Sequence, residues 1–304
     1  MIYDKYAFTI PEGKSIRFIT DTDAKNEADD QYAIAHALLT PRFDVRGIIA
    51  SHFGDLKSKT SMEDSYQEVE KVLSLMDMDK SLACKGAPRA LVDERTPIPS
   101  AGAELIIREA LSQDARPLYV VFQGPLTNLA SALLMEPRIE SRLTAIWIGG
   151  GAYPQGGREY NLSNDIDAAN VVFRSRIPLW QVPQNVYRMV MVSMAELEAR
   201  VRPHGEIGRY LFEQLVAWGQ TESGRRSAYR TGECWCLGDS PVVGLLLNEQ
   251  DFDSDWTPAP EITRDMFYVH TGRNRPIRVY RSVDSRFILE DFYAKLALFA
   301  RNRR

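Results

Sequence analysis

Carboxylic acids crowd one short stretch of the sequence. The segment DTDAKNEADD, residues 21–30, contains five of them: Asp21, Asp23, Glu27, Asp29 and Asp30. They follow directly on the apolar run IRFIT at 16–20. Carboxylates this close together repel one another, and burial at the end of a strand makes their ionised forms still more costly. The pattern therefore requires something that offsets their charge.

The simplest explanation is a solvated loop before a helix. Asp29 and Asp30 would then open that helix, where negative charge complements the positive end of the helix dipole. This explanation covers two of the acids, but it does not account for Asp21 and Asp23 at the end of a strand.

A second explanation is a phosphotransferase site. DTD after the first strand resembles the DxDx[T/V] nucleophile motif of the haloacid dehalogenases, and GDS at 238–240 resembles their late acidic motif. Position 25, however, is Lys rather than Thr or Val, and no second Asp follows within GDSPVVGLLL.

A third explanation is a hard divalent cation. Calcium takes six to eight oxygen ligands and accepts carboxylates, carbonyls and waters together. Asp23, Asp30 and the distant Asp239 could supply anionic ligands and so offset the repulsion within the segment.

Four blocks of the sequence resemble the nucleoside hydrolases, which are calcium-dependent N-ribohydrolases on an open α/β sheet. DTDAKNEADD is similar to their DxDxGxDD, and QGPLTNLASAL (123–133) is similar to [TS]G[PG]LTNxAxA. IGGGAYPQGGREYNLSNDIDAANVVF (148–173) resembles MGG…G…EFNxxxDPEAAxxVF, and LGDSPVV (237–243) matches HDPxAV in part. Because the blocks keep the family's order over nearly the whole chain, the chain is identified as a divergent member of inosine-uridine preferring type.

The resemblance implies a role for each matching residue. It implies calcium ligands at Asp23, Asp30, Asp239 and the backbone carbonyl of Gln123, with Asp21 supporting the site from beside the ion. It implies that Asp29 activates water, and that Glu159 and Asn161 hold ribose hydroxyls. It further implies a nucleoside or related riboside as substrate, and a homodimer or homotetramer.

The chain departs from the family pattern at three places. Five residues, AKNEA, separate Asp23 from Asp29 where the family has three, Gly238 stands in place of a His, and Gly157 in place of an Asn. We therefore expect other residues to contact the leaving base. The candidates are Trp235, by stacking, and His52 or Tyr229, as proton donors.

The chemistry of such a site follows from its charge. Cleavage of an N-glycosidic bond builds positive charge on the sugar, which an anionic site stabilises. A metal-bound water loses its proton more readily, and Asp29 is the expected general base. Two alternatives stay open: a hydrolase of another ribosyl or glycosyl compound, and a ribose- or metal-binding protein without catalysis.

The elements that must position these residues alternate along the chain. Apolar strands at 16–20, 45–51, 117–122, 144–149 and 178–182 are separated by helical patterns, the first of them at 29–39. Such alternation predicts an open, mostly parallel Rossmann-like α/β sheet with helices on both faces, which binds ligands at the carboxyl ends of its strands. Beyond residue 190 we expect a mostly helical part, with a strand pair at 266–272 and 277–283. No linker divides the sequence, so one domain is expected over 1–304.

Composition narrows the class of protein. The 304 residues carry a net charge of -4 without a basic stripe, which argues against nucleic acid as a partner. No apolar run approaches the ~20 residues needed to cross a membrane, and we find no signal peptide. Three cysteines fit a reducing cytoplasm better than a disulfide framework.

Overall fold

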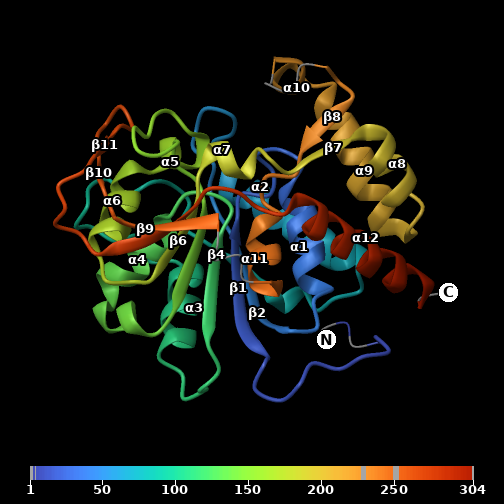
Figure 1. Ribbon diagram of the computed structural model, residues 1–304, viewed down its shortest axis with the longest axis horizontal. Coiled ribbons are helices and arrows are strands. Elements are labelled where there is room, and N and C mark those ends of the chain that lie inside the picture. Colours follow the sequence, from blue (N-terminus) through green and yellow to red (C-terminus); the bar gives the residue numbers. More distant parts are fainter. Residues whose placement is uncertain (1–2, 4, 227–230, 249–252, 303–304) are drawn as a thin grey trace.

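An eight-stranded, mostly parallel sheet forms the centre of the molecule (Figure 1). The computed structural model describes residues 3, 5–226, 231–248 and 253–302. The sheet order is β3-β2-β1-β4-β5-β6-β12-β9, and β9 runs antiparallel to β12. These strands are β1 (Ile16–Thr22), β2 (Phe43–Ala50), β3 (Ala83–Lys85), β4 (Leu118–Phe122), β5 (Thr144–Ile148), β6 (Leu179–Val182), β9 (Ser254–Pro258) and β12 (Pro276–Tyr280).

Helices cover both faces of the sheet (Figure 1). One face carries α1 (Asp30–Leu38), α2 (Ser61–Leu75), α11 (Pro241–Leu247) and α12 (Ser285–Arg301). The other carries α3 (Ala101–Ala110), α4 (Thr127–Met135) and α6 (Ile166–Arg174). Successive strand residues serve opposite faces, since Phe18 lies in the first hydrophobic cluster and Ile19 in the second. The predicted α/β class is confirmed.

Strand β1 marks the point at which the order of the sheet reverses. The chain continues from β1 to β2 and β3 on one side, and then to β4, β5 and β6 on the other. Loops that leave two strands in opposite directions open a crevice at their carboxyl ends, where sheets of this kind bind ligands. The acidic segment begins within β1 and lies at this crevice.

The C-terminal part is helical but adds more strands than predicted. Its further elements are β7 (Met191–Ser193), α8 (Met194–Arg200), α9 (Gly205–Gly219), α10 (Glu222–Arg226), β8 (Cys234–Cys236), β10 (Glu261–Ile262) and β11 (Tyr268–Val269). The predicted pairing of 266–272 with 277–283 is wrong, because β11 pairs with β10 while β12 joins β6 and β9. Ile277 and Val279 bury their side chains in the main core there, which a separate hairpin would not allow.

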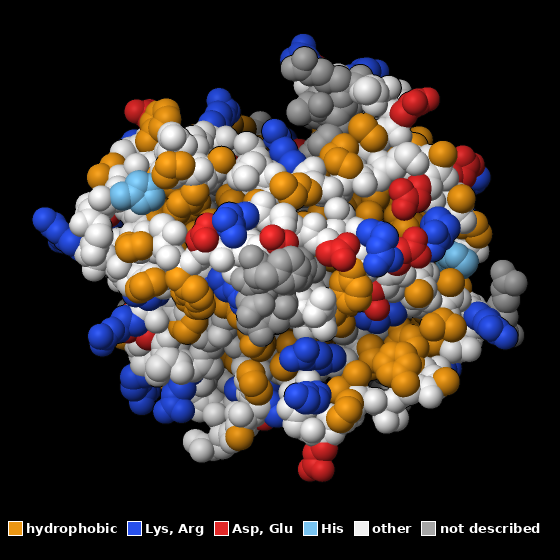
Figure 2. Space-filling view, in the orientation of Figure 1, with side chains coloured by type: hydrophobic (Ala, Val, Ile, Leu, Met, Phe, Trp, Pro, Cys, Tyr) orange, Lys and Arg blue, Asp and Glu red, His pale blue; other side chains and the backbone are white. Residues whose placement is uncertain are grey.

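The surface charge pattern and the lengths of the helices can be described for the same residues. Basic and acidic side chains are interspersed over the face drawn in Figure 2. None of the described helices is both long and apolar enough to cross a membrane. The organisation of 1–304 as one domain stays a prediction.

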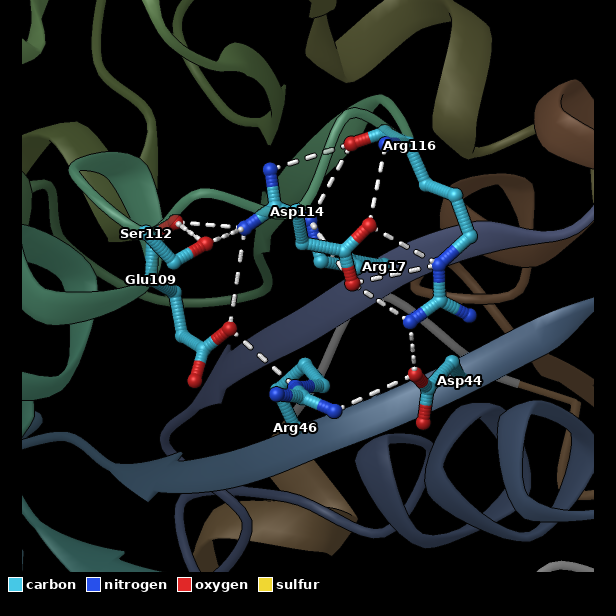
Figure 3. A network of polar contacts seen from close by, with 7 residues as sticks. All are labelled: Arg17, Asp44, Arg46, Glu109, Ser112, Asp114 and Arg116. Carbon is cyan, nitrogen blue, oxygen red and sulfur yellow. Dashed lines mark hydrogen bonds and ion pairs between the residues drawn. The ribbon is translucent and has the colours of Figure 1, made fainter.

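A buried arginine ties β1 to the loop that precedes β4 (Figure 3). The Arg17 side chain is 3% exposed and donates to the carbonyl oxygens of Glu109 and Arg116, at 2.5 and 3.0–3.1 Å. It also donates to Ser112 Oγ at 2.7 Å and lies 3.9 Å from the Asp114 carboxylate. The guanidinium therefore satisfies backbone groups that would otherwise be buried without a donor.

We expect Arg17→Leu to lower the free energy of unfolding by ~3–5 kcal/mol, because it leaves buried acceptors without their charged partner. Urea denaturation measures this loss. Arg138→Leu is the matched control, since Arg138 pairs with Glu136 at 2.6 Å but is 75% exposed. An exposed pair contributes ~0–1 kcal/mol, so equal losses in both variants would contradict the prediction.

Candidate active site

A polar cavity opens at the carboxyl ends of the central strands, beside the point where the sheet order reverses. Residues that follow β1, β4, β5 and β6 line it, and α5 (Tyr160–Asn164) and α7 (Gln184–Tyr187) lie at this edge in Figure 1. Six of the lining residues are acids: Asp23, Glu27, Asp29, Asp30, Glu159 and Asp239. The fold thus gathers acids from both ends of the chain around one space.

Three of these acids converge on a single point. Carboxylate oxygens of Asp29, Asp30 and Asp239 lie within 4.8 Å of one another, and together they could hold a metal ion. Asp30 accepts a hydrogen bond from Thr22 Oγ1 at 2.5 Å and shares one with Asp239. Asp239 stands just before α11, so tertiary packing alone brings it to the acidic segment.

Asp23 lies at the same cavity, immediately after β1. Its Oδ2 is buried and has no hydrogen-bond partner among the described residues. The loop after β4 comes close to it, since a Cβ on Gly124 would lie 3.2 Å from Asp23 Cβ and Cγ. Glycine at 124 therefore permits this approach, and the buried carboxylate oxygen is an atom that a cation would satisfy.

Burial and mutual repulsion disturb the titration of the cluster. Burial raises the pKa of Asp23, Asp29 and Asp239, and the neighbouring carboxylates raise each further. Burial also raises the pKa of Asp30 to about 7. A cation among these groups would favour their ionised forms, and an all-oxygen donor set suits a hard divalent ion such as calcium or magnesium. The residues present therefore fit a divalent cation.

Asp29 stands at the N-cap position of α1 but does not cap it. Its side chain makes no capping hydrogen bond, and its carboxylate instead accepts from the backbone N–H of Gly238. The solvated-loop explanation is therefore wrong for Asp29, because the cavity rather than the helix end determines where its carboxylate points. Asp29 is the partly exposed member of the three converging acids, which suits it to accept a proton.

Glu159 and Asn161 stand at the start of α5. Glu159 is 1% exposed and accepts hydrogen bonds from the backbone of Asn161 and Leu162, which caps the helix. Asn161 Nδ2 donates to the carbonyl oxygens of Gln123 and Ile148 at 3.0 and 2.8 Å. Asn161 itself lines the cavity.

Gln123 lies at the wall of the cavity, whereas Asp21 is buried and does not line it. Gln123 lines the cavity, and its side-chain Oε1 accepts from Thr20 Oγ1 at 2.5 Å. Asp21 lies behind the cavity, fully buried, where it accepts from Ser51 Oγ and from Asn128 Nδ2 at 2.8 Å. Burial raises the pKa of Asp21 to about 7.

Two of the three candidates for contact with the leaving base, His52 and Trp235, do not line this cavity. His52 is fully buried, its Nε2 lies 2.8 Å from Thr127 Oγ1, and burial lowers its pKa to about 4. Trp235 packs edge-to-face on Trp218, with ring centroids 5.1 Å apart, and lines a neighbouring hollow. Tyr229 lies outside the described residues.

The longer acidic loop brings two residues to the cavity that the family pattern does not supply. Asn26 and Glu27 both line it, and Lys57 Nζ donates to Asn26 Oδ1 at 2.5 Å. Lys25 pairs with the buried carboxylate of Glu68 at 2.8 Å and so fastens the loop to α2. The five-residue spacing was the sequence signal for this bulge.

Sequence reasoning missed a group of residues after β6. Gln184, Tyr187 and Arg188 line the cavity from α7 and the residue after it. Their position at the carboxyl end of a parallel strand was a usable signal, because every such end faces the same crevice.

The comparisons with known proteins agree on one family. The family model described as inosine-uridine preferring nucleoside hydrolase matches residues 18–290. The pyrimidine-specific ribonucleoside hydrolase RihA of Salmonella gallinarum is 26% identical over 311 aligned positions, which cover 90% of this chain and 96% of that protein. A purine-preferring ribonucleoside hydrolase from Gardnerella vaginalis has a TM-score of 0.78 at 19% identity, covering 94% of this chain and 99% of its own. An inosine-guanosine nucleoside hydrolase has a TM-score of 0.72 at 21% identity, covering 92% and 98%.

Proposed function

Because the chain belongs to the inosine-uridine preferring nucleoside hydrolase family, we propose that it hydrolyses the N-glycosidic bond of a ribonucleoside with the help of calcium. Membership makes it an N-ribosyl hydrolase, a glycosidase. The observation that carries the proposal is the convergence of Asp29, Asp30 and Asp239 within 4.8 Å, in the cavity that Glu159 also lines.

Calcium is proposed to bind at the acidic cluster. Asp23, Asp30, Asp239 and the carbonyl oxygen of Gln123 are the proposed ligands, and Asp21 supports them from behind. The buried Oδ2 of Asp23 and the raised pKa values of the cluster support this assignment. When bound, the cation would supply positive charge that lowers the pKa of a water and orients sugar hydroxyls.

The chain's own residues perform the remaining steps. Asp29 accepts a proton from the attacking water. Its carboxylate is available for this because it makes no capping hydrogen bond to α1. Glu159 and Asn161, which line the cavity, position the ribose. Positive charge develops on the sugar as the bond to the base breaks, and the surrounding carboxylates stabilise it.

The relatives differ in the base they accept, so the base is left to experiment. One is described as pyrimidine-specific and another as purine-preferring. Ribose release from uridine, cytidine, inosine, adenosine and guanosine, with calcium or with chelator, tests the proposal. We expect release from at least one of them, and expect chelator to stop it.

Other outcomes point to the alternatives. Ribose release only from non-nucleoside ribosides would indicate another glycosidase. Binding of ribose without release from any compound would indicate a binding protein and would contradict the proposed activity. We also propose a cytoplasmic homo-oligomer, as the cysteine content and the family resemblance suggest.

A further inference from the structure

The Glu159 carboxylate already accepts four hydrogen bonds. Its Oε2 accepts from the backbone N–H groups of Gly150 and Leu162, at 2.8 and 2.9 Å. Its Oε1 accepts from the backbone N–H of Asn161 at 3.1 Å and from the Tyr187 hydroxyl at 3.0 Å. Two carboxylate oxygens offer about four lone-pair sites, so this group is saturated. A sugar hydroxyl that approaches Glu159 must therefore either displace one of these donors or bind to it.

Only one of the four donors is adaptable. Three are backbone amides at the end of β5 and the start of α5, where displacement would break the turn and the helix cap. The fourth is a side-chain hydroxyl, which can accept one hydrogen bond while it donates another. Tyr187 lines the cavity and is partly exposed, so a ligand there could reach its side chain.

The ring of Tyr187 lies close to Gly238, which is also close to Asp29. A Cβ placed on Gly238 would lie 3.0 Å from Tyr187 Cδ2 and 3.5 Å from Asp29 Oδ2. Tyr187 and Asp29 thus both approach Gly238, and the Tyr187 hydroxyl donates to Glu159. Its backbone is held in place, since Tyr187 N donates to Pro183 O at 3.1 Å. Tyr187, Asp29 and Glu159 all line the cavity, so a sugar bound there would lie near this ring.

We propose that Tyr187 is a sugar-binding residue and that Glu159 acts on the sugar through it. A sugar hydroxyl donates to the Tyr187 oxygen, and the Tyr187 hydroxyl donates to the Glu159 carboxylate. Glu159 thereby orients the phenol and makes it a better acceptor. The inference rests on the proposed function, since it takes the ligand of the cavity to be a riboside.

The test compares Tyr187→Phe, Glu159→Gln and the double variant on uridine or inosine, whichever the protein cleaves faster. The 2′-, 3′- and 5′-deoxy forms of that nucleoside complete the set. We expect Tyr187→Phe to lower kcat/KM about tenfold on the parent nucleoside, mainly through KM. The loss should vanish on one deoxy form, and the loss caused by Glu159→Gln should vanish on that same form. The double variant should lose no more than the worse single variant, because both residues act in one chain.

Tyr6 offers a matched control outside the cavity. Tyr6→Phe also removes one hydroxyl, which donates to Leu39 O at 2.7 Å outside the cavity, and it should leave kcat/KM unchanged. A Tyr187→Phe protein that matches or exceeds the wild type, or that loses equally on every deoxy form, would overturn the inference while the proposed function stands. If the wild type cleaves no nucleoside, calorimetric titration with ribose decides. Binding that Tyr187→Phe weakens supports the inference, and absence of ribose binding overturns it.

Discussion

Asp29→Asn is expected to lower kcat by about 10²- to 10⁴-fold, the usual contribution of a general base. The amide cannot accept a proton from water, although it is nearly the same size as the carboxylate and can still accept from the Gly238 N–H. KM for the nucleoside should change less than kcat, since the ribose contacts assigned to Glu159 and Asn161 are untouched. Steady-state kinetics with calcium in excess measures both constants.

Calcium binding separates the role of Asp29 from that of the proposed ligands. Asp29→Asn should keep calcium, because Asp23, Asp30 and Asp239 remain. Asp23→Asn is the matched comparison and should lose most of its calcium affinity, since its buried Oδ2 is a proposed ligand atom. Isothermal titration calorimetry measures both. If Asp29→Asn loses calcium as Asp23→Asn does, Asp29 is a ligand and its assignment as the base is wrong.

Removal of calcium is expected to stop turnover and to change how stability depends on pH. Without the ion, burial raises the pKa of the Asp30 carboxyl to about 7 in the folded protein, against a pKa near 4 in the unfolded chain. Between these values the folded state binds more protons, so stability falls as the pH rises from about 4 to about 7. Calcium takes the place of those protons, so it should stabilise the protein most above pH 7 and little near pH 4.

Thermal unfolding at pH 5 and pH 7.5, each with calcium and with chelator, measures this difference. At pH 7.5, calcium at 100 times its Kd should add ~2.7 kcal/mol of stability. Asp23→Asn and Asp239→Asn should weaken the response, whereas Asp79→Asn, on the surface far from the cavity, should not. A calcium effect equal at both pH values would argue against binding at the acidic cluster.

Local sequence patterns were sufficient to predict the sheet and the side on which chemistry takes place. Short apolar strands alternate with amphipathic helices, and that alternation specifies parallel strands covered on both faces. Because the carboxyl ends of such strands meet at one edge, the acids after β1, the QGPL turn after β4 and the EYN segment after β5 were bound to face one crevice. The five carboxylates of residues 21–30 by themselves already indicated that a positive charge must lie nearby.

Only the tertiary structure decided which distant segments meet. Periodicity reports the face that a segment buries, but it does not report its partner, so β12 was assigned to a hairpin instead of the central sheet. The same limit applies to His52. It follows a strand whose carboxyl end faces the crevice, but its Nε2 lies 2.8 Å from Thr127 Oγ1 and the residue does not line the cavity. Tyr187 carries no motif, and the role proposed for it follows from the 3.0 Å hydrogen bond of its hydroxyl to Glu159. Such contacts depend on the packing of whole elements, which no local pattern of residues encodes.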